Sequence, residues 1–335
     1  IVGFSTQRNL EYLHGLHGEH FQATAFFSAV GEAVNFLWDH DVPDDIRRRV
    51  KKLMDDYGFE AWGAYAQSPT RSSALAATFA GEAADRYPEL DSTLFSLFGL
   101  VIFYADYLDA LEKVNRGDDA AVSLAVFGDA SVPAVAPMPG VALLCALARG
   151  WLRAEAAASI VAACGRPKEE VDTLASLCSR FQEHPVPVAL VTSSGAHETQ
   201  LVLEAVFRAM GEEVCAWGLE SAEEDRVVRG FSSPEAYFDA IVTCDDVIPG
   251  RTKPYRDPYT MALERLGLDR ARAELAMGFE DTEVGIIAQR GAGIGMPCAL
   301  PIEFTRSQDF TAAAHVLPGG VLDAVLKYGL FMRPS

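Results

Sequence analysis

The sequence predicts an α/β protein whose C-terminal half is a parallel sheet with helices on both faces, preceded by an α-helical subdomain. From about residue 186 onward, short apolar runs alternate with helix-length segments, which is typical of strand–helix repeats. From about residue 14 to residue 128, apolar residues instead recur every three to four positions, and no β-rich segment interrupts them. These two patterns divide the chain into a helical part and an α/β part.

The helical part is expected to contain several amphipathic helices. In the first of them, Phe26, Val30, Val34 and Leu37 fall on one face, so they are candidate core residues. The apolar stretch 94–104 is shorter than the roughly 18 residues that a membrane span needs, and we expect it to be a buried helix. The expected helices of this part cover residues 21–38, 71–87, 94–114 and 120–127.

The α/β part is expected to begin after a linker. Residues 130–140, ASVPAVAPMPG, carry three prolines and a glycine, which is typical of a connecting segment. The expected strands cover residues 188–191, 238–243, 274–280 and 298–301. The expected helices cover residues 141–148, 154–163, 168–183, 198–210, 258–266 and 283–290. In sheets of this kind, ligands bind at the carboxyl ends of the strands.

The chain is strongly acidic, with a formal net charge of −19 over 335 residues. This charge repels nucleic acid and anionic membrane surfaces, so neither is an expected partner, but a locally positive pocket is compatible with a small phosphorylated ligand. Six cysteines are scattered without a CxxC pair, which favours free thiols in a reducing compartment over a disulfide framework. No apolar run reaches about 18 residues, so we expect a soluble protein without membrane insertion.

A hydroxyl-rich turn follows the first expected strand of the α/β part. Thr192, Ser193, Ser194 and Gly195 stand between this strand and the next helix. Hydroxyls and backbone amides at such a point can cradle a phosphate. The same residues could instead cap the helix, which would give them a purely structural role.

Two further candidate sites stand at or beside strand ends. Lys253 is held in an extended loop before a proline, where it could neutralise a phosphoryl group or be an ordinary solvated lysine. Glu280 and Asp281 follow an apolar strand, where carboxylates are placed to hold Mg²⁺ directly or through water. The alternative is that Asp281 caps the following helix and complements its dipole.

The order and spacing of these residues resemble the haloacid dehalogenase superfamily. The strings FDAIVTCDDVIPGRTKPYRDPYTMALERLGL and MGFEDTEVGIIAQRGAGIGMPCALP carry the resemblance, which is closest to the branch of β-phosphoglucomutase and the CbbY-like sugar-phosphate phosphatases. It covers about residues 185–316 and implies a Rossmann-like core with an inserted α-helical cap. It also implies that the phosphate-binding residues are Thr192, Ser193 and Lys253, and that the metal ligands are Glu280 and Asp281.

The chain departs from this family at the first motif. Members carry a strand ending in Asp-x-Asp-Gly-Thr, in which the first Asp attacks phosphorus and the second works as general acid and base. The candidate strand here is IVGF at residues 1–4, and aligning the two places Ser5 at the nucleophile and Gln7 at the acid/base. A serine hydroxyl is not ionised at neutral pH without a partnered base, and Gln7 cannot shuttle a proton. Losing an Asp ligand would also weaken a Mg²⁺ site.

This mixture of retained and lost residues leaves two functions open. The first is a catalytically degenerate relative, a pseudoenzyme that keeps the fold and an anion site and serves as a binding or structural protein with protein partners, as in a larger assembly. The second is an active Mg²⁺-dependent phosphatase or phosphomutase on a small sugar phosphate, which would need an Asp from elsewhere in the chain. We expect the first, because losing the nucleophile and the acid/base together costs many orders of magnitude in rate.

Three histidines, His14, His17 and His20, form HGLHGEH where the core is expected to meet the cap. At helical spacing they could hold zinc, although two intervening glycines argue against a rigid helix. A second interpretation, implied by the resemblance, is that His20 is a hinge residue that contacts substrate. Ordinary packing at the hinge is the third.

The pattern and the resemblance together predict a division of the chain. Residues 1–13 would be the first core strand and the degenerate motif, residues 14–130 the cap, and residues 131–335 the core with an extra helical insertion at about 151–183. The chain begins at Ile1 rather than at methionine. Together with the family branch, this favours an organelle matrix or stroma over the cytoplasm.

Overall fold

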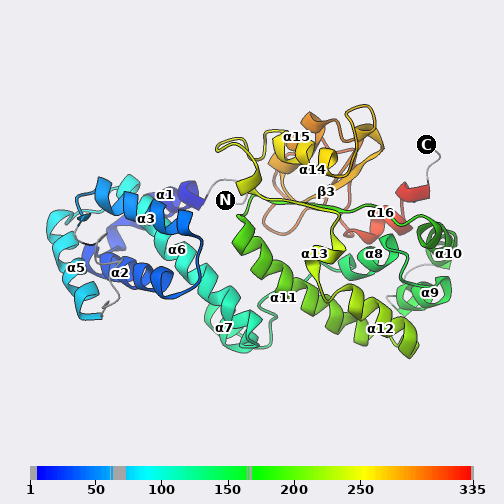
Figure 1. Cartoon of the computed structure of the whole chain (residues 1–335), viewed down its shortest axis with the longest axis horizontal. Helices are drawn as coiled ribbons and strands as arrows, with labels where there is room; N and C mark the ends of the chain where they lie inside the picture. The colour runs from blue at the N-terminus through cyan, green and yellow to red at the C-terminus, as the bar shows by residue number, and fades with distance from the viewer. Residues whose placement is uncertain (1–5, 61, 63–72, 164, 166–167, 333–335) are drawn as a thin grey trace. The chain divides into compact units, whose positions relative to one another are not determined.

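The computed structural model describes the chain except for residues 1–5, 61, 63–72, 164, 166–167 and 333–335 (Figure 1). The described residues form two compact units, which divide between Lys113 and Val114. The strand expected at residues 1–4 lies outside the described residues.

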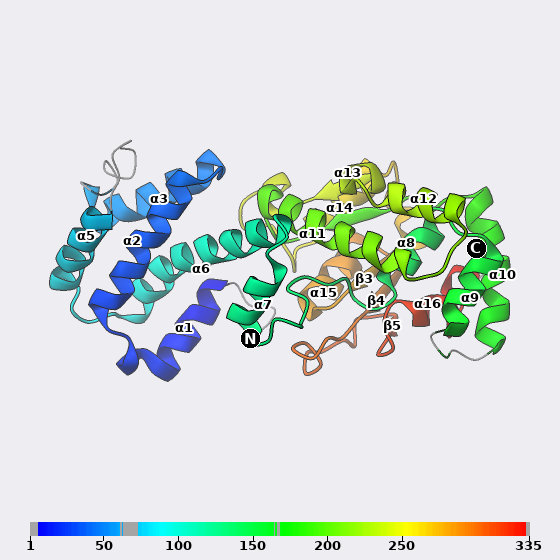
Figure 2. The same ribbon diagram turned by 90° about the horizontal axis from the view of Figure 1, so that it is seen from below.

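The first unit is helical throughout its described part. The aligned face predicted from the sequence is confirmed, because Phe26, Val30, Val34 and Leu37 are all buried. Helices α2 and α5 pack along each other. The helices, drawn from blue to cyan in Figures 1 and 2, are α1 (Thr6–His17), α2 (Ala23–Asp39), α3 (Asp44–Asp56), α5 (Ser73–Arg86) and α6 (Ser92–Asn115).

Aromatic rings fill the centre of this unit. The ring of Phe27 meets the rings of Phe59, Phe79 and Phe98 edge-on, with centroids 5.9–6.2 Å apart. Phe27, Phe79 and Phe98 have no exposed surface. Edge-to-face pairs of this kind stabilise a core beyond the apolar area that they bury. The core therefore depends on α2, α5 and α6 together.

Helix α6 is, among the described helices, the single one that is long and apolar enough to cross a membrane. Half of its most apolar window is buried inside the structure, and Leu94, Phe98 and Leu108 contribute to the buried face. The core helix of a soluble protein has the same length and composition. The expectation of a buried helix at 94–104 is confirmed, within a longer helix than the apolar stretch alone indicates.

Helix α1 begins at Thr6, well before residue 14, where the helical block was expected. Leu10 packs against α6, where a Cβ atom on Gly99 would lie 3.2 Å from Leu10 Cδ1. Gln7, which the alignment with the family motif places at the acid/base position, lies in the first turn of α1 and donates to Glu11 Oε1 at 3.4 Å and Ser96 Oγ at 3.5 Å. The chain at Gln7 is thus helical and contacts α6 through Ser96.

The described part of the second unit contains five short strands, all paired in parallel. β1 (Ala189–Val191) pairs with β2 (Ala240–Val242). β3 (Met277–Glu280) pairs with β4 (Met296–Ala299), and β4 pairs with β5 (His315–Val316). The predicted parallel pairing is confirmed, but the strands form two small sheets and β5 was not predicted.

The helices of the second unit connect the strands, as the alternation predicted. α8, α9 and α10 cover the expected ranges, whereas α12 lies where no helix was expected. α14 packs against β1, β2 and α15. The helices of this unit are α7 (Asp119–Phe127), α8 (Val141–Ala148), α9 (Ala154–Ala163), α10 (Lys168–Glu183), α11 (Ala196–Cys215), α12 (Ser221–Gly230), α13 (Pro234–Tyr237), α14 (Asp257–Arg265), α15 (Glu283–Ala292) and α16 (Leu322–Leu326).

Tyr237 lies at the centre of a second aromatic core. Its ring is within 6.2 Å, centroid to centroid, of the rings of Trp151, Phe207 and Phe231. Its hydroxyl donates to the carbonyl oxygen of Cys145 at 3.2 Å. A buried hydroxyl of this kind is satisfied by the backbone and plays no part in the strand ends described below.

The substitution Phe98→Ala tests the aromatic core of the first unit. Removing this fully buried ring is expected to lower the free energy of unfolding by about 3–5 kcal/mol, because it leaves a cavity among its neighbours. Urea denaturation followed by circular dichroism measures the loss. Phe103→Ala is the control, since Phe103 is on the same helix but is 47% exposed, and it should cost less than about 1 kcal/mol. Equal losses in the two variants would contradict the placement of α6.

Candidate functional site

One lysine joins the carboxyl ends of β1 and β3. Lys253 lies in the loop between β2 and α14, and its ammonium donates to the carbonyl oxygen of Val191, the last residue of β1, at 3.1 Å. The same ammonium pairs with Oε1 of Glu280, the last residue of β3. The side chains of Lys253 and Glu280 are only 11% and 6% exposed. Lys253 is therefore not an ordinary solvated lysine.

Both carboxylate oxygens of Glu280 are bonded. Oε1 also accepts from the hydroxyl of Tyr259 at 3.0 Å. Oε2 accepts from the backbone N–H of Asp281 at 3.1 Å, and from the N–H and hydroxyl of Thr282 at 3.2 and 2.9 Å. A buried carboxylate is costly unless it is paired and hydrogen-bonded, and Glu280 meets both conditions.

The start of α15 is shaped around the Glu280 carboxylate. A Cβ atom on Gly285, in the first turn of this helix, would overlap the carboxylate carbon and oxygens of Glu280. Glycine at this position therefore allows the helix backbone to approach the charge closely. The helix is capped by Thr282, whose hydroxyl accepts from the N–H of Gly285 at 3.3 Å. The alternative that Asp281 is the capping residue is wrong.

The two adjacent carboxyls are shifted in opposite directions. Burial raises the pKa of Asp281, and the negative charge of Glu280 raises it further. Burial would also raise the pKa of Glu280, but attraction to Lys253 and the hydrogen bonds from Lys253 and Thr282 bring it below the ordinary value. Glu280 is thus the fixed partner of the lysine, while Asp281 takes up a proton more easily than a free aspartate.

The turn after β1 lies next to the carbonyl that Lys253 contacts. The N–H of Thr192 donates to the Val242 carbonyl at 2.9 Å, which continues the pairing of β1 with β2. The Thr192 hydroxyl accepts from the N–H of Ser194 at 3.1 Å, so it stabilises the turn. The helix that follows has Gly195 as its N-cap residue and receives no side-chain bond from it. The capping interpretation of the hydroxyl cluster is therefore not what the structure shows.

A carboxylate in the loop after β2 accepts a hydrogen bond from the start of α11 instead. Asp245, three residues beyond the end of β2, accepts from the N–H of Ala196 at 2.8 Å. The N–H of Cys244 donates to the carbonyl of Ser194 at 3.0 Å, which holds the two loops together. The helix N-terminus therefore already faces a negative group of the protein itself.

The carboxylates at this edge are the residues that would hold the Mg²⁺ implied by the family resemblance. Among the residues described, no group of three His, Cys, Asp or Glu side chains is placed to hold a metal ion. Glu280 could ligate a metal only by giving up contacts to Lys253, Tyr259 or Thr282. Asp281 is the remaining carboxylate at this strand end. These residues alone do not fit a Mg²⁺ site.

The structure brings Lys253, Glu280 and the turn at Thr192 and Ser193 to one edge of the strands. The residues of the candidate first motif are not among those described at this edge. Ser5 lies outside the described residues, and Gln7 belongs to helix α1 of the first unit.

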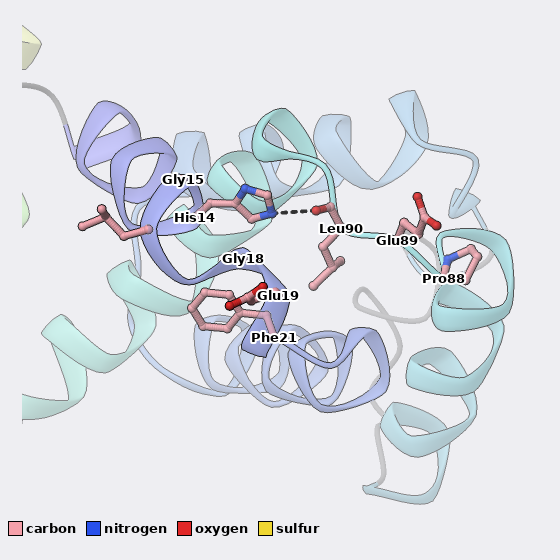
Figure 3. Close-up of a pocket in the computed structure, with 9 residues that line it drawn as sticks. His14, Gly15, Gly18, Glu19, Phe21, Pro88, Glu89 and Leu90 are labelled. Carbon is pink, nitrogen blue, oxygen red and sulfur yellow. Dashed lines mark hydrogen bonds between the residues drawn. The ribbon is translucent and has the colours of Figure 1, made fainter.

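His14 lies in the first unit, beside an open hollow. Its Nε2 donates to the carbonyl oxygen of Leu90 at 2.6 Å, as the dashed line in Figure 3 marks. The hollow has a volume of about 700 Å³, and Glu19 and Glu89 are among the residues that line it. Two carboxylates at its wall do not favour an anionic ligand.

The other two histidines point elsewhere. The rings of His17 and His20 stack on each other with centroids 6.4 Å apart. The side chain of His20 is 71% exposed and lies 3.7 Å from Glu19. Because His14 is bonded to the backbone, the trio is not arranged as a zinc site. A substrate contact by His20 stays a prediction.

Sequence reasoning missed two residues of the site. Tyr259 contacts Glu280 from α14, and Gln289 on α15 donates its amide N–H to the Tyr259 hydroxyl at 3.3 Å. Both are buried. Polar side chains on the buried faces of two predicted helices were the available signal, because such groups need partners.

The substitution Lys253→Met tests the buried pair. It leaves Glu280 charged and unpaired, so the free energy of unfolding is expected to fall by about 3 kcal/mol at neutral pH. Chemical denaturation measures the loss. Lys327→Met removes an exposed lysine of the same unit and should change stability by less than about 0.5 kcal/mol.

The loss is expected to depend on pH. The pKa of Glu280 is lowered from the ordinary glutamate value of 4.5. The pairing therefore contributes its full stability above pH 4.5, and this stability is lost as the pH falls through the pKa of Glu280 in the folded protein. In Lys253→Met, burial acts without the lysine and raises the pKa of Glu280. The difference in stability between the wild type and the variant should therefore be largest near neutral pH and shrink as the pH falls toward and below the ordinary value of 4.5. A difference that stays constant over this range would contradict the pairing.

Comparison with known proteins gives a partial likeness. No protein-family model matches the chain, and no curated protein sequence matches it. Among solved structures, CbbY from Rhodobacter sphaeroides in complex with phosphate is 24% identical with a TM-score of 0.30. A mutant of the same protein in complex with xylulose-(1,5)-bisphosphate is 24% identical with a TM-score of 0.29. Each match covers 43% of this chain and 52% of the matched chain, so this chain spans about half the length of the matched protein. The assignment of an α/β fold rests on the parallel strand pairs, and the description of the site rests on the contacts given above.

Proposed function

We propose that this chain is a haloacid dehalogenase-like protein that binds a small phosphorylated ligand at the carboxyl edge of its strands and does not transfer the phosphoryl group. The observation that supports this most is the position of the Lys253 ammonium, fixed between the Val191 carbonyl and Glu280 and next to the turn at Thr192. The sequence motifs that resemble this superfamily place an anion at the same edge.

The lysine has a donor left for a ligand. An ammonium carries three N–H groups, and the contacts to Val191 and Glu280 use two of them. Because the side chain is only 11% exposed, the third N–H would act in a partly desolvated setting, where a hydrogen bond to an anion is stronger than in water. The backbone and hydroxyls of Thr192 and Ser193 would supply the other contacts.

The absence of transfer is proposed from the chemistry of the first motif. Ser5 and Gln7 stand where the resembling family has its nucleophile and its general acid/base, and neither can take that role at neutral pH without help. In the described part of the chain, the carboxyl beside Asp281 is Glu280, which is already bonded to Lys253, Tyr259 and Thr282. Asp245, another carboxylate that the structure describes at this edge, accepts from the N–H of Ala196, and we assign neither it nor Glu280 as the nucleophile.

A binding role also fits the expectation of protein partners. Membership of a larger assembly, and an organelle matrix or stroma as its place, are predictions from the sequence that the fold leaves untouched. We include them in the proposal as the setting in which a binding subunit without turnover would be kept.

Ligand titration and a turnover assay test the proposal together. The purified chain is expected to bind inorganic phosphate or a small sugar phosphate in calorimetry, and to release no phosphate from a panel of sugar phosphates with Mg²⁺. Lys253→Met should weaken binding at least roughly tenfold, because it removes a charge-assisted hydrogen bond. Lys327→Met removes an exposed lysine that is not part of the site, so this variant should bind phosphate with the affinity of the wild type.

Two results would overturn the proposal. The first is phosphate release by the natural chain that Asp281→Ala abolishes, which would establish an active phosphatase. The second is equal phosphate affinity in the wild type and Lys253→Met. A Ser5→Asp variant, assayed alongside, shows whether restoring a carboxylate is enough to start turnover.

A further inference from the structure

Behind the Lys253–Glu280 pair, two buried side chains form a continuous row of hydrogen bonds. The Tyr259 hydroxyl donates to the same Glu280 oxygen that the lysine contacts, at 3.0 Å. Gln289 donates its amide N–H to the Tyr259 hydroxyl at 3.3 Å. Tyr259 is 6% exposed and Gln289 is fully buried.

The order of donors fixes the direction of this row. The Gln289 amide occupies an acceptor position of the Tyr259 oxygen, so the single hydroxyl proton is directed to Glu280. Burial raises the pKa of Tyr259 well above its ordinary value, and the negative charge of Glu280 raises it further, so the hydroxyl keeps its proton at all ordinary pH values. The row therefore always presents a donor to the carboxylate.

Tyr259 also contacts the lysine directly. The Lys253 ammonium lies over the Tyr259 ring, 5.4 Å from its centroid, which is within the range of a cation–π interaction. The ring thus supports the ammonium, while the hydroxyl at its edge supports the partner of that ammonium. One side chain holds both members of the pair.

Two glycines provide the space for this row. A Cβ atom on Gly278 in β3 would lie 2.6 Å from the side-chain amide atoms of Gln289. A Cβ atom on Gly285 would overlap the Glu280 carboxylate. Distances this short are not found between real Cβ atoms and their neighbours, so a larger residue at either position would displace the row.

We propose that Tyr259 and Gln289 are positioning residues that hold Glu280, and through it the Lys253 ammonium, in place at the end of β3. Their effect on ligand binding rests on the proposed function, in which this ammonium contacts the phosphate. Neither residue would touch the ligand. They act by restricting the lysine to one orientation, which reduces the entropy lost when an anion binds.

Tyr259→Phe in the full-length chain tests the proposal, because it removes the hydroxyl and keeps the ring. The local readout is the acylation of Lys253 by limiting acetic anhydride, measured by mass spectrometry relative to Lys327. We expect labelling of Lys253 to rise several-fold, since Glu280 loses one of its donors and holds the ammonium less firmly. Inorganic phosphate should bind a few-fold more weakly, a smaller loss than in Lys253→Met, because Tyr259 positions the ammonium and does not touch the ligand.

Tyr237→Phe is the matched control. It also removes the hydroxyl of a buried tyrosine in the same unit, but that hydroxyl donates to the Cys145 carbonyl rather than to the site. A merely structural loss would act alike in the two variants, so Tyr237→Phe should leave the labelling of Lys253 and the affinity for phosphate unchanged. Gln289→Met serves as a second test if Tyr259→Phe does not fold, and should shift both readouts in the same direction by a smaller factor.

The outcomes separate the two proposals. Unchanged labelling of Lys253 in Tyr259→Phe, or an equal rise in Tyr237→Phe, would overturn the positioning role whatever the affinity for phosphate. Increased labelling in a chain whose wild type binds neither inorganic phosphate nor a sugar phosphate would support the positioning role and overturn the proposed function. Increased labelling together with weaker phosphate binding supports both.

Discussion

One buried ion pair connects the strand ends and loops at the carboxyl edge of the second unit. Lys253 and Glu280 are both largely removed from water, and isolated charges in such a place would cost several kcal/mol each. Their pairing ties the end of β1, the loop before α14 and the end of β3 to one point. The surrounding donors, from Tyr259 and Thr282, complete the hydrogen bonding of the carboxylate, so the loops at this edge are held to each other by contacts within the protein.

The sequence predicted the parts of this edge that follow from chain order. Parallel strands place their carboxyl ends together, so Thr192, Lys253 and Glu280, each at or beside a strand end, were expected to converge, and they do. Tyr259 and Gln289 were not predicted, although both are polar side chains on the buried faces of their helices, because the sequence does not show which groups are their partners. Their contact with Glu280 arises when α14 and α15 pack together, which no local pattern encodes.

In the first unit, the sequence predicted the helices from their apolar spacing but not the structure of the N-terminal residues. The helices of the first unit were predicted from their apolar spacing, and the buried face of α2 follows it closely. At Gln7, however, the sequence was interpreted by aligning it with a family motif, and that alignment did not predict that the chain there forms α1, with Leu10 packed beside Gly99. Helix α1 belongs to the same compact unit as the other helices before Lys113. The second unit begins at Val114, which lies within the residues that the sequence assigned to the cap. Apolar packing, rather than the motif, decides the structure there.

The charges at the carboxyl edge of the strands limit how strongly this site could attract an anion. The charge of Lys253 is matched by Glu280, and Asp245 and Asp281 add negative groups on the adjoining loops. What the lysine offers an anion is therefore a directed N–H rather than a surplus of positive charge. Phosphoryl transfer needs such a surplus to neutralise the equatorial oxygens in the transition state, whereas binding of the ground state needs only well-placed donors. Burial and the negative charge of Glu280 both raise the pKa of Asp281. In the proposed function, retention of a ligand rests on the directed N–H of Lys253 and not on net positive charge at the site.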